Sequence, residues 1–429
     1  MKKILFTILT FALFANSAIL HFKKYELKGK EKGDTLLVIG GIHGNEPGGY
    51  FAPAVLIQHY KILKGNLVVV PNLNYDSDIR NKRGIYRDMN RKFAYISKKD
   101  PDYRIVTDIK KLILSKDIDL VINLHDGHGF YRKKWYNVIF NPKAWGQALI
   151  IDQRNIKTPK YYNLGEICNK ITTGINNKIF RKKHIFGVKN TKTKFKDEQM
   201  RLSLTYFAIT HNKPALAIET SKNITELKKK VYYQLLTIEE FMHTMGIKFK
   251  RDFKLNEKNI EKILNDYETL CINDRFKIDL NRVKSFMNFM PIKRKNNDFK
   301  FTHPLGGVVK YRNYYQVMIG NKKIFRFKPD YFELSPVKPH IVMFLDGKRR
   351  DVSNLFNVEV KRYFKVVVPK NIRVNVIGFY TKDHMEAGVD VYLRRMVRKY
   401  SVYKNENVYR VEFYDSKNRY IKTILVKFQ

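Results

Sequence analysis

Two residues that commonly bind metals, His43 and Glu46, lie three positions apart in the segment LLVIGGIHGNEPGGY, residues 36–50. The first four residues form an apolar run that predicts a buried strand, and the glycines after it end that strand. His43 and Glu46 are therefore expected in a loop at the carboxyl end of a strand, where open α/β sheets bind ligands. An imidazole and a carboxylate at this place suggest two ligands of a divalent metal. For the pair alone, an ordinary strand-to-helix turn is the alternative.

Two further residues of the same chemical kinds follow apolar runs. His125 comes directly after residues 120–124, and Glu219 comes directly after residues 214–218. Strand ends of one sheet meet in one crevice, so these side chains are expected close to the loop pair. Two histidines, one carboxylate and an open position are the ligand set of a catalytic zinc, and a second carboxylate can act as general base. We therefore predict a zinc site from the loop pair and His125, with Glu219 as the base.

His128, in the segment HDGHG, competes with His125 as the third ligand. We favour His125 because it is the closer of the two to the strand end, and because Gly127 loosens the chain after it. His128 or Asp126 is then expected to orient a ligand or to contact the substrate.

The segment IRNKRGIYRDMNRKF, residues 79–93, concentrates positive charge around one asparagine; its members are Arg80, Arg83, Arg87, Asn90 and Arg91. Arginine binds carboxylates through two parallel hydrogen bonds, and an asparagine amide adds a directional contact. The segment predicts a fork for a substrate carboxylate, with one further arginine near the reacting carbonyl. In so basic a chain, a solvated surface loop is the alternative.

The elements that must position these residues alternate between strand and helix from about residue 18 to 248, which is typical of an α/β domain. Strands are expected at 36–39, 67–70, 120–124 and 214–218, and helices at 50–61, 103–115, 198–211 and 224–245. Residues 251–280 look partly helical. From about residue 299 onward, short runs rich in valine and aromatic residues alternate with turns, and SPVKP, residues 335–339, predicts a linker. This pattern predicts two small β units.

The chain has 429 residues, with 83 Lys and Arg against 40 Asp and Glu, and a formal net charge of +43. Such a charge favours anionic polymers, namely nucleic acid, anionic lipid or an acidic cell-wall polymer. No nucleic-acid-binding signature accompanies it, so nucleic acid is not expected as a partner. A basic solvated surface without a partner is the alternative.

The first residues, MKKILFTILTFALFANSA, have the basic, apolar and small-residue order of a secretory signal peptide. We predict a signal peptide over residues 1–17 and a mature protein in the periplasm without an integral membrane segment. The apolar run is short for a membrane span, although an uncleaved anchor is the alternative.

Cys168 and Cys271 form no C-x-x-C pair and fall in different predicted domains, which disfavours a disulfide between them.

Taken together, HGNE, Arg…Asn-Arg, a histidine after a strand and a strand-end glutamate resemble the zinc metallocarboxypeptidase (funnelin) superfamily. The resemblance covers the first half of the chain. It implies zinc ligation by His43, Glu46 and His125, and it makes Glu219 the general base. It also implies that Asn90 and Arg91 hold the carboxylate of the leaving residue. Arg83 then polarises the carbonyl, although residue type alone leaves Arg80 open for this role.

The short spacings from Arg83 to Asn90 and from Glu46 to His125 are more similar to the aspartoacylase and succinylglutamate desuccinylase branch. With its signal peptide, charge and β-rich tail, however, the whole chain resembles the exported peptidoglycan DL-carboxypeptidases that determine helical cell shape. That resemblance implies a mixed central sheet in a carboxypeptidase domain (18–248), a small β-barrel-like domain (249–337) and an immunoglobulin-like β-sandwich (338–429).

The same resemblance implies an enzyme that trims peptidoglycan stem tripeptides to dipeptides and releases meso-diaminopimelate. Muropeptides are its expected partners, and other cell-wall proteins are further candidates. Trp145, Thr205 and His128 are expected to line the substrate site. The alternatives are an N-acyl amino acid deacylase and a non-catalytic wall-binding protein that keeps the fold. The intact histidine and glutamate set argues against the second.

Overall fold

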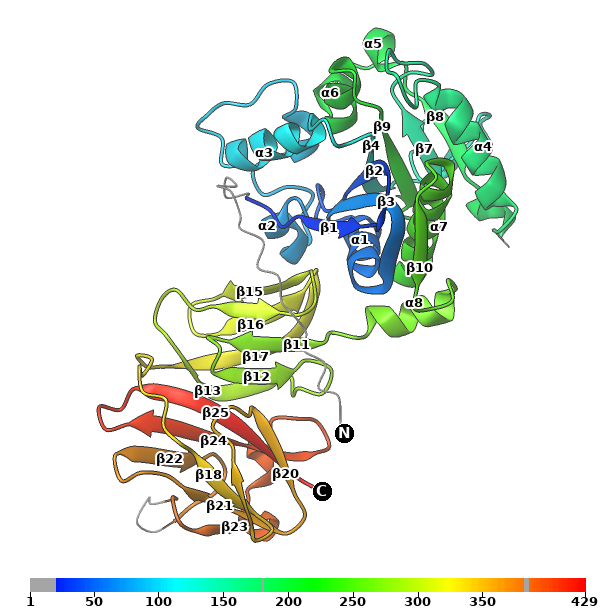
Figure 1. Ribbon diagram of the computed structural model, residues 1–429. Helices are drawn as coiled ribbons and strands as arrows, with labels where there is room; N and C mark the ends of the chain where they lie inside the picture. Colours follow the sequence, from blue (N-terminus) through cyan, green and yellow to red (C-terminus); the bar gives the residue numbers. More distant parts are fainter. Residues whose placement is uncertain (1–20, 180, 382–385) are drawn as a thin grey trace.

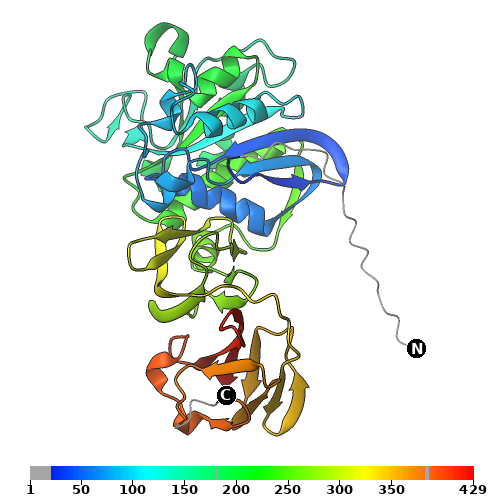
Figure 2. The same cartoon turned by 90° about the vertical axis from the view of Figure 1, so that its left-hand side faces the viewer.

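The computed structural model describes residues 21–179, 181–381 and 386–429, so the predicted signal peptide lies outside the described residues. The described chain forms three tiers: an α/β region, two small sheets and a β-sandwich (Figures 1 and 2). This is the multidomain architecture that the sequence predicts. Among the described residues, no helix combines the length and the apolar character that crossing a bilayer requires.

The α/β region is built on one mixed sheet with the strand order β1-β3-β2-β4-β9-β7-β8, and β10 pairs with β3. Neighbours from β3 to β9 run parallel, whereas β1, β10 and β7 join antiparallel. The strands are β1 Tyr25–Lys28, β2 Glu31–Ile39, β3 Tyr60–Val70, β4 Leu120–Gly127, β7 Ala148–Ile151, β8 Gly187–Asn190, β9 Ala215–Ser221 and β10 Lys248–Arg251. The short pair β5 Phe130–Tyr131 and β6 Phe140–Asn141 lies apart from this sheet.

Helix α7 contacts α1 and α4, all three helices contact the sheet, and α6 contacts β4 and β9. The α-helices are α1 Pro47–His59, α2 Tyr75–Ile79, α3 Tyr103–Ile113, α4 Leu164–Asn176, α5 Thr193–Lys196, α6 Leu204–Thr210, α7 Leu227–Thr244 and α8 Glu257–Leu264. Single 3-10 turns are η1 Met89–Arg91, η2 Lys182–His184, η3 Met200–Leu202, η4 Leu393–Arg395 and η5 Arg398–Tyr400.

The register of the sheet fixes the site. β2, β4 and β9 are adjacent and parallel, and His125 of β4 pairs directly with Glu219 of β9. The sequence placed each residue directly after an apolar run. In the structure each lies inside its strand, two positions before the end, because pairing between β4 and β9 continues to Gly127 and Ser221. The three strands therefore present their carboxyl ends at one edge.

The helix expected over residues 198–211 is interrupted. Ser203 lies between η3 and α6 in an extended conformation, and its side chain accepts a hydrogen bond from Tyr206 N. A serine that caps a helix in this way starts a new helix instead of continuing the previous one.

Helix α4 was not predicted from the sequence, because its threonines and asparagines are weak helix formers and its stability comes from packing against α7.

The middle region consists of a three-stranded sheet, β12-β11-β14, and a four-stranded sheet, β13-β17-β16-β15. Its strands are β11 Thr269–Ile272, β12 Phe276–Asp279, β13 Phe286–Ile292, β14 Phe299–Phe301, β15 Gly306–Lys310, β16 Tyr315–Ile319 and β17 Lys322–Tyr331. Its buried side chains belong to the same apolar core as those of the α/β region. Lys322 ties the two together: its Nζ donates to Leu264 O at 2.6 Å and lies 5.4 Å from the centre of the Phe51 ring.

The C-terminal region packs two four-stranded sheets, β19-β18-β21-β23 and β20-β25-β24-β22, around a second apolar core. Its strands are β18 Val342–Leu345, β19 Lys348–Asp351, β20 Asn357–Val360, β21 Tyr363–Val367, β22 Ile372–Val376, β23 Asp390–Tyr392, β24 Asn407–Asp415 and β25 Tyr420–Phe428. Cys168 and Cys271 are both free, in agreement with the separation expected from the sequence.

Candidate metal centre and active site

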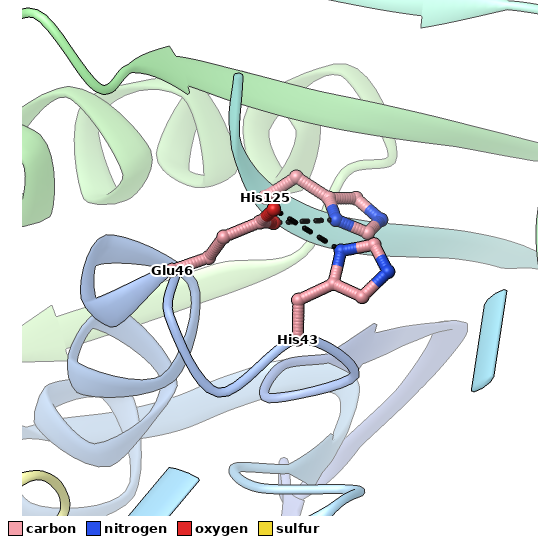
Figure 3. A group of neighbouring side chains, drawn as sticks. All are labelled: His43, Glu46 and His125. Atoms are coloured by element: carbon pink, nitrogen blue, oxygen red, sulfur yellow. Dashed lines mark hydrogen bonds and ion pairs between the residues drawn. The ribbon is translucent and has the colours of Figure 1, made fainter. Parts of the chain in front are cut away.

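His43, Glu46 and His125 form one cluster whose ligand atoms all lie within 4.8 Å of one another (Figure 3). Nδ1 of His43 lies 3.1 Å from Glu46 Oε1, and Nδ1 of His125 lies 2.9 Å from Glu46 Oε2. All three side chains are buried, and His43 Nδ1 makes no hydrogen bond within the described residues. Two imidazole nitrogens and a carboxylate that converge in this way fit a catalytic metal.

The glycines of the first loop are needed for close packing. A Cβ at Gly44 would lie 1.9 Å from the carbonyl oxygen of Ser77, in the chain segment after β3. The loop between His43 and Glu46 therefore lies directly against a neighbouring backbone, which only a glycine permits. The next residue after the loop, Pro47, opens α1 at a position where its missing N–H costs nothing.

The remaining nitrogen of each histidine is also held. His43 Nε2 lies 2.8 Å from Asp88 Oδ1, and His125 Nε2 lies 2.7 Å from the side-chain amide of Asn123. In His43, the Asp88 carboxylate at Nε2 fixes the ring orientation and the tautomer that leaves Nδ1 free for a metal.

Charges around Glu46 keep it ionised. Burial alone would raise its pKa, but the charge of His43 and the hydrogen bonds of His43 and His125 lower the pKa of Glu46 well below its usual value. Arg83 Nη1 at 3.1 Å and Lys222 Nζ at 3.2 Å add two cations beside Oε1. Burial lowers the pKa of His125, so this ring is neutral and able to bind a metal.

Glu219 extends from β9 towards the same cluster. Its Oε2 is buried and makes no hydrogen bond to any described residue. Burial and the charges of Glu46 and Asp126 raise the pKa of Glu219 well above its usual value. A Cβ at Gly127 would lie 2.7 Å from that Oε2 and 2.5 Å from Trp145 Cβ, so the space beside the carboxylate depends on the glycine.

Asp88 organises the arginine-rich segment. Its Oδ1 accepts from Asn90 N at 2.9 Å, which caps η1, and its Oδ2 accepts from Arg83 Nε at 3.0 Å. Asn90 Oδ1 accepts from Leu204 N at 2.9 Å, which leaves its Nδ2 without a partner among the described residues. Arg91 Nη1 donates to Asn90 O at 3.0 Å. One aspartate thus joins a metal-site histidine, an arginine and the Asn90–Arg91 turn.

One cavity of about 410 Å³ brings all the predicted site residues together. The members that line it are His43, Glu46, Arg83, Asn90, Arg91, His125, His128, Trp145, Thr205 and Glu219. Arg80 is exposed instead and lies 3.5 Å from Asp76, so it is Arg83 that faces the cluster.

Two residues of the site were not assigned from the sequence. Lys222 lines the cavity, but one lysine in a chain with 83 basic residues carries no signal of its own. Asp88 was detectable, since an aspartate two residues before Asn90 is typical of a capped turn. Asp126, which the sequence predicted to orient a ligand or to contact the substrate, lines the cavity and accepts from Gly48 N at 3.0 Å, at the start of α1.

A family model described as "Carboxypeptidase controlling helical cell shape catalytic" matches residues 1–265, and one described as "C-terminal domain of metallo-carboxypeptidase" matches residues 335–429. The chain belongs to this family of cell-shape carboxypeptidases. The chain is therefore a metallo-carboxypeptidase, and the His43, Glu46 and His125 cluster is the candidate for its metal centre.

Solved structures of the cell shape determinant Csd4 from Helicobacter pylori are similar to this cell-shape carboxypeptidase over nearly its whole length. The tripeptide-bound form is 36% identical, with a TM-score of 0.90, and the alignment covers 95% of this chain and 100% of that one. The mDAP-bound form, described as a D,L-carboxypeptidase, is 36% identical, with a TM-score of 0.90 and coverage of 94% and 100%. The apo form has a TM-score of 0.91. No curated protein matches the chain.

Replacing Asp88 of this cell-shape carboxypeptidase by asparagine should weaken metal binding and kcat/KM by about 10- to 100-fold each. The amide keeps one acceptor for His43 but presents no charge to Arg83. Competition with a chelator measures the metal affinity. Asp76→Asn removes the same charge from an exposed neighbour and should change neither quantity. An unaltered metal affinity in Asp88→Asn would show that the negative charge of Asp88 does not support the metal ligand His43.

Proposed function

We propose that the protein is an exported, zinc-dependent DL-carboxypeptidase that trims peptidoglycan stem tripeptides to dipeptides, releases meso-diaminopimelate and thereby influences cell shape. The observation that carries the proposal is the single cavity in which the metal cluster, Glu219 and the Asn90–Arg91 turn meet. Membership of the cell-shape carboxypeptidase family and the tripeptide- and mDAP-bound structures of Csd4 support the choice of substrate.

Zinc is the proposed metal because two histidines and one carboxylate, without a cysteine, are its usual catalytic ligands. Export to the periplasm is proposed from the order of residues in the first 18 positions. The division into domains at 248/249 and 337/338 is also a proposal. The second boundary is supported by the second apolar core within residues 341–428.

Asn90 Nδ2 and the Arg91 guanidinium grip the terminal carboxylate of the leaving residue. Arg91 supplies charge, and the amide supplies a directed donor, which together fix where the chain must end. Arg83 lies between this grip and Glu46, so it donates to the scissile carbonyl oxygen as negative charge develops there. Trp145 and Thr205 line the rest of the cavity and shape it to the side chain of the leaving residue.

A divalent metal bound at His43, Glu46 and His125 supplies Lewis acidity and lowers the pKa of water. Glu219 Oε2, which has no other partner, accepts the proton of the attacking water and then gives it to the amine of the leaving residue. The charge of a metal bound at the cluster would offset the charge of Glu46 and favour the ionised form of Glu219 that this step requires.

The test is mass spectrometry of purified muropeptides after incubation with the protein. Tripeptides should be cut to dipeptides, whereas tetrapeptides and tripeptides with an amidated end should remain intact. An added residue pushes the carboxylate past the Asn90–Arg91 grip, and a misplacement of about 1 Å already costs on the order of 10²-fold. Arg91→Ala should lower tripeptide cleavage strongly, and the exposed Arg104→Ala should not.

Equal cleavage of tripeptide and tetrapeptide at the same bond would show an endopeptidase and would remove Asn90 and Arg91 from carboxylate binding. Hydrolysis of N-acyl amino acids in preference to muropeptides would instead identify the N-acyl amino acid deacylase alternative.

A further inference from the structure

Seven consecutive residues, 133–139, are exposed in the loop between β5 and β6 and are here called the rim loop. Four of them are large and apolar: Trp135 is 58% exposed, Tyr136 69%, Val138 84% and Ile139 38%. Single exposed apolar residues are ordinary, but a contiguous group on a folded surface marks a contact site. The sequence has no acidic residue between His128 and Asp152, so the surface around this group is also basic.

The exposure does not come from a loosely held loop. On the inner side, the rings of Phe130 and Phe140 stack with their centres 4.7 Å apart. Arg132 donates through Nη2 to Lys183 O at 2.8 Å. Asn137 Oδ1 accepts from the backbone N–H groups of Ile139 and Phe140, each at 2.9 Å. The rim loop thus has an anchored aromatic inner side, and its apolar outer side chains are not needed to hold it.

The base of the loop adjoins the cavity. His128 O accepts from Trp145 N at 2.9 Å, and Tyr131 N donates to Gly146 O at 2.8 Å, which closes the base of the loop. His128 and Trp145 both line the cavity. The rim loop therefore begins and ends within a few residues of the cavity lining.

We propose that the rim loop binds the sugar end of a glycan-linked stem peptide, with Trp135 and Tyr136 packed on the apolar face of an N-acetylated sugar ring. This inference rests on the proposed function. The peptide ends at Asn90 and Arg91 inside a cavity of about 410 Å³, near the lower limit of about 300–1,000 Å³ for ligand sites. The amino end, which carries the sugars, must then lie outside. Flat, amphipathic rings suit a sugar surface because they offer large contact area at low entropic cost.

A bilayer of anionic lipid also attracts tryptophan, tyrosine and lysine. The base of the rim loop, however, adjoins the cavity that His128 and Trp145 line, so a bilayer bound there would compete with the substrate for this side of the protein. The position of the loop therefore favours the glycan.

The first experiment compares kcat/KM for a disaccharide-linked tripeptide and for the same tripeptide without sugar. In Trp135→Ala/Tyr136→Ala, the ratio of the two values should fall on the order of 10-fold relative to the parent protein. Phe289→Ala removes an equally exposed ring, 61%, from the middle region and should leave the ratio as it is. An unchanged ratio in the double variant would overturn the proposal.

The second experiment does not depend on activity. Trp135 and Trp145 are the chain's two tryptophans, so fluorescence reports on the loop and the cavity. Titration with N,N′-diacetylchitobiose should shift the emission to shorter wavelength in the parent protein, because the sugar replaces water on the indole. Trp135→Phe should abolish the shift, and no shift in the parent would contradict the proposal. If neither peptide is cleaved, the proposed function fails, while the titration still decides on the loop.

Sedimentation with phosphatidylglycerol vesicles addresses the membrane. Binding that disappears in Trp135→Ala/Tyr136→Ala, together with an unchanged substrate ratio, would assign the rim loop to lipid and overturn the glycan proposal.

Discussion

Glu219→Gln should retain the metal and the folded structure but lose activity on the order of 10²–10⁴-fold in kcat, equivalent to about 3–5 kcal/mol of activation free energy. Glutamine has the same shape but cannot accept the proton of the attacking water. Because Glu219 Oε2 makes no hydrogen bond to a described residue, the substitution breaks none there. Steady-state kinetics on the tripeptide substrate measures the loss.

The comparison that gives this result its meaning is metal content, since an activity lost together with the metal says nothing about the base. Elemental analysis should find the same metal content in Glu219→Gln as in the parent protein. A rate within a few-fold of the parent value would remove Glu219 from the mechanism.

His43→Ala should lose most of the bound metal and, with it, nearly all activity. The variant removes one of three ligands from the cluster, and the remaining Glu46 keeps His125, Arg83 and Lys222 as partners, so the buried carboxylate is not left uncompensated. Elemental analysis after dialysis checks the metal, and the melting temperature checks the fold.

The matched control is His128→Ala, which removes an imidazole from the same cavity but from outside the ligand cluster. It should keep its metal. If His43→Ala retained as much metal as His128→Ala and the parent protein, the metal would be bound elsewhere.

The positions of the chemical groups were predictable from the sequence because they depend on strand ends. A short apolar run followed by a histidine or glutamate needs only the rule that parallel strands end at one edge, and β2, β4 and β9 are indeed adjacent. The change to short, valine-rich runs after residue 299 likewise predicted β units, because strand residues alternate over short distances.

Features that depend on tertiary contacts were not predictable. β3 begins at Tyr60 rather than at residue 67, since its first half is a strand only through pairing with β10, far along the chain. Lys222 and Asp88 acquire their places from partners on other segments, Glu46 and His43. Residue type predicts which chemistry is available, whereas the partner is determined by how the chain packs.

Because the α/β region and the middle region share one apolar core, we expect the two to unfold together. Tyr50 and Phe51, in the helix that follows Glu46, belong to the same core as Phe325 and Phe327 of β17. The middle region contributes no residue to the lining of the cavity, yet it packs against α1, the helix that follows the metal-binding loop. Catalysis therefore depends on strands that do not line the cavity. The part of the chain that the activity needs is larger than the α/β region that holds the site residues.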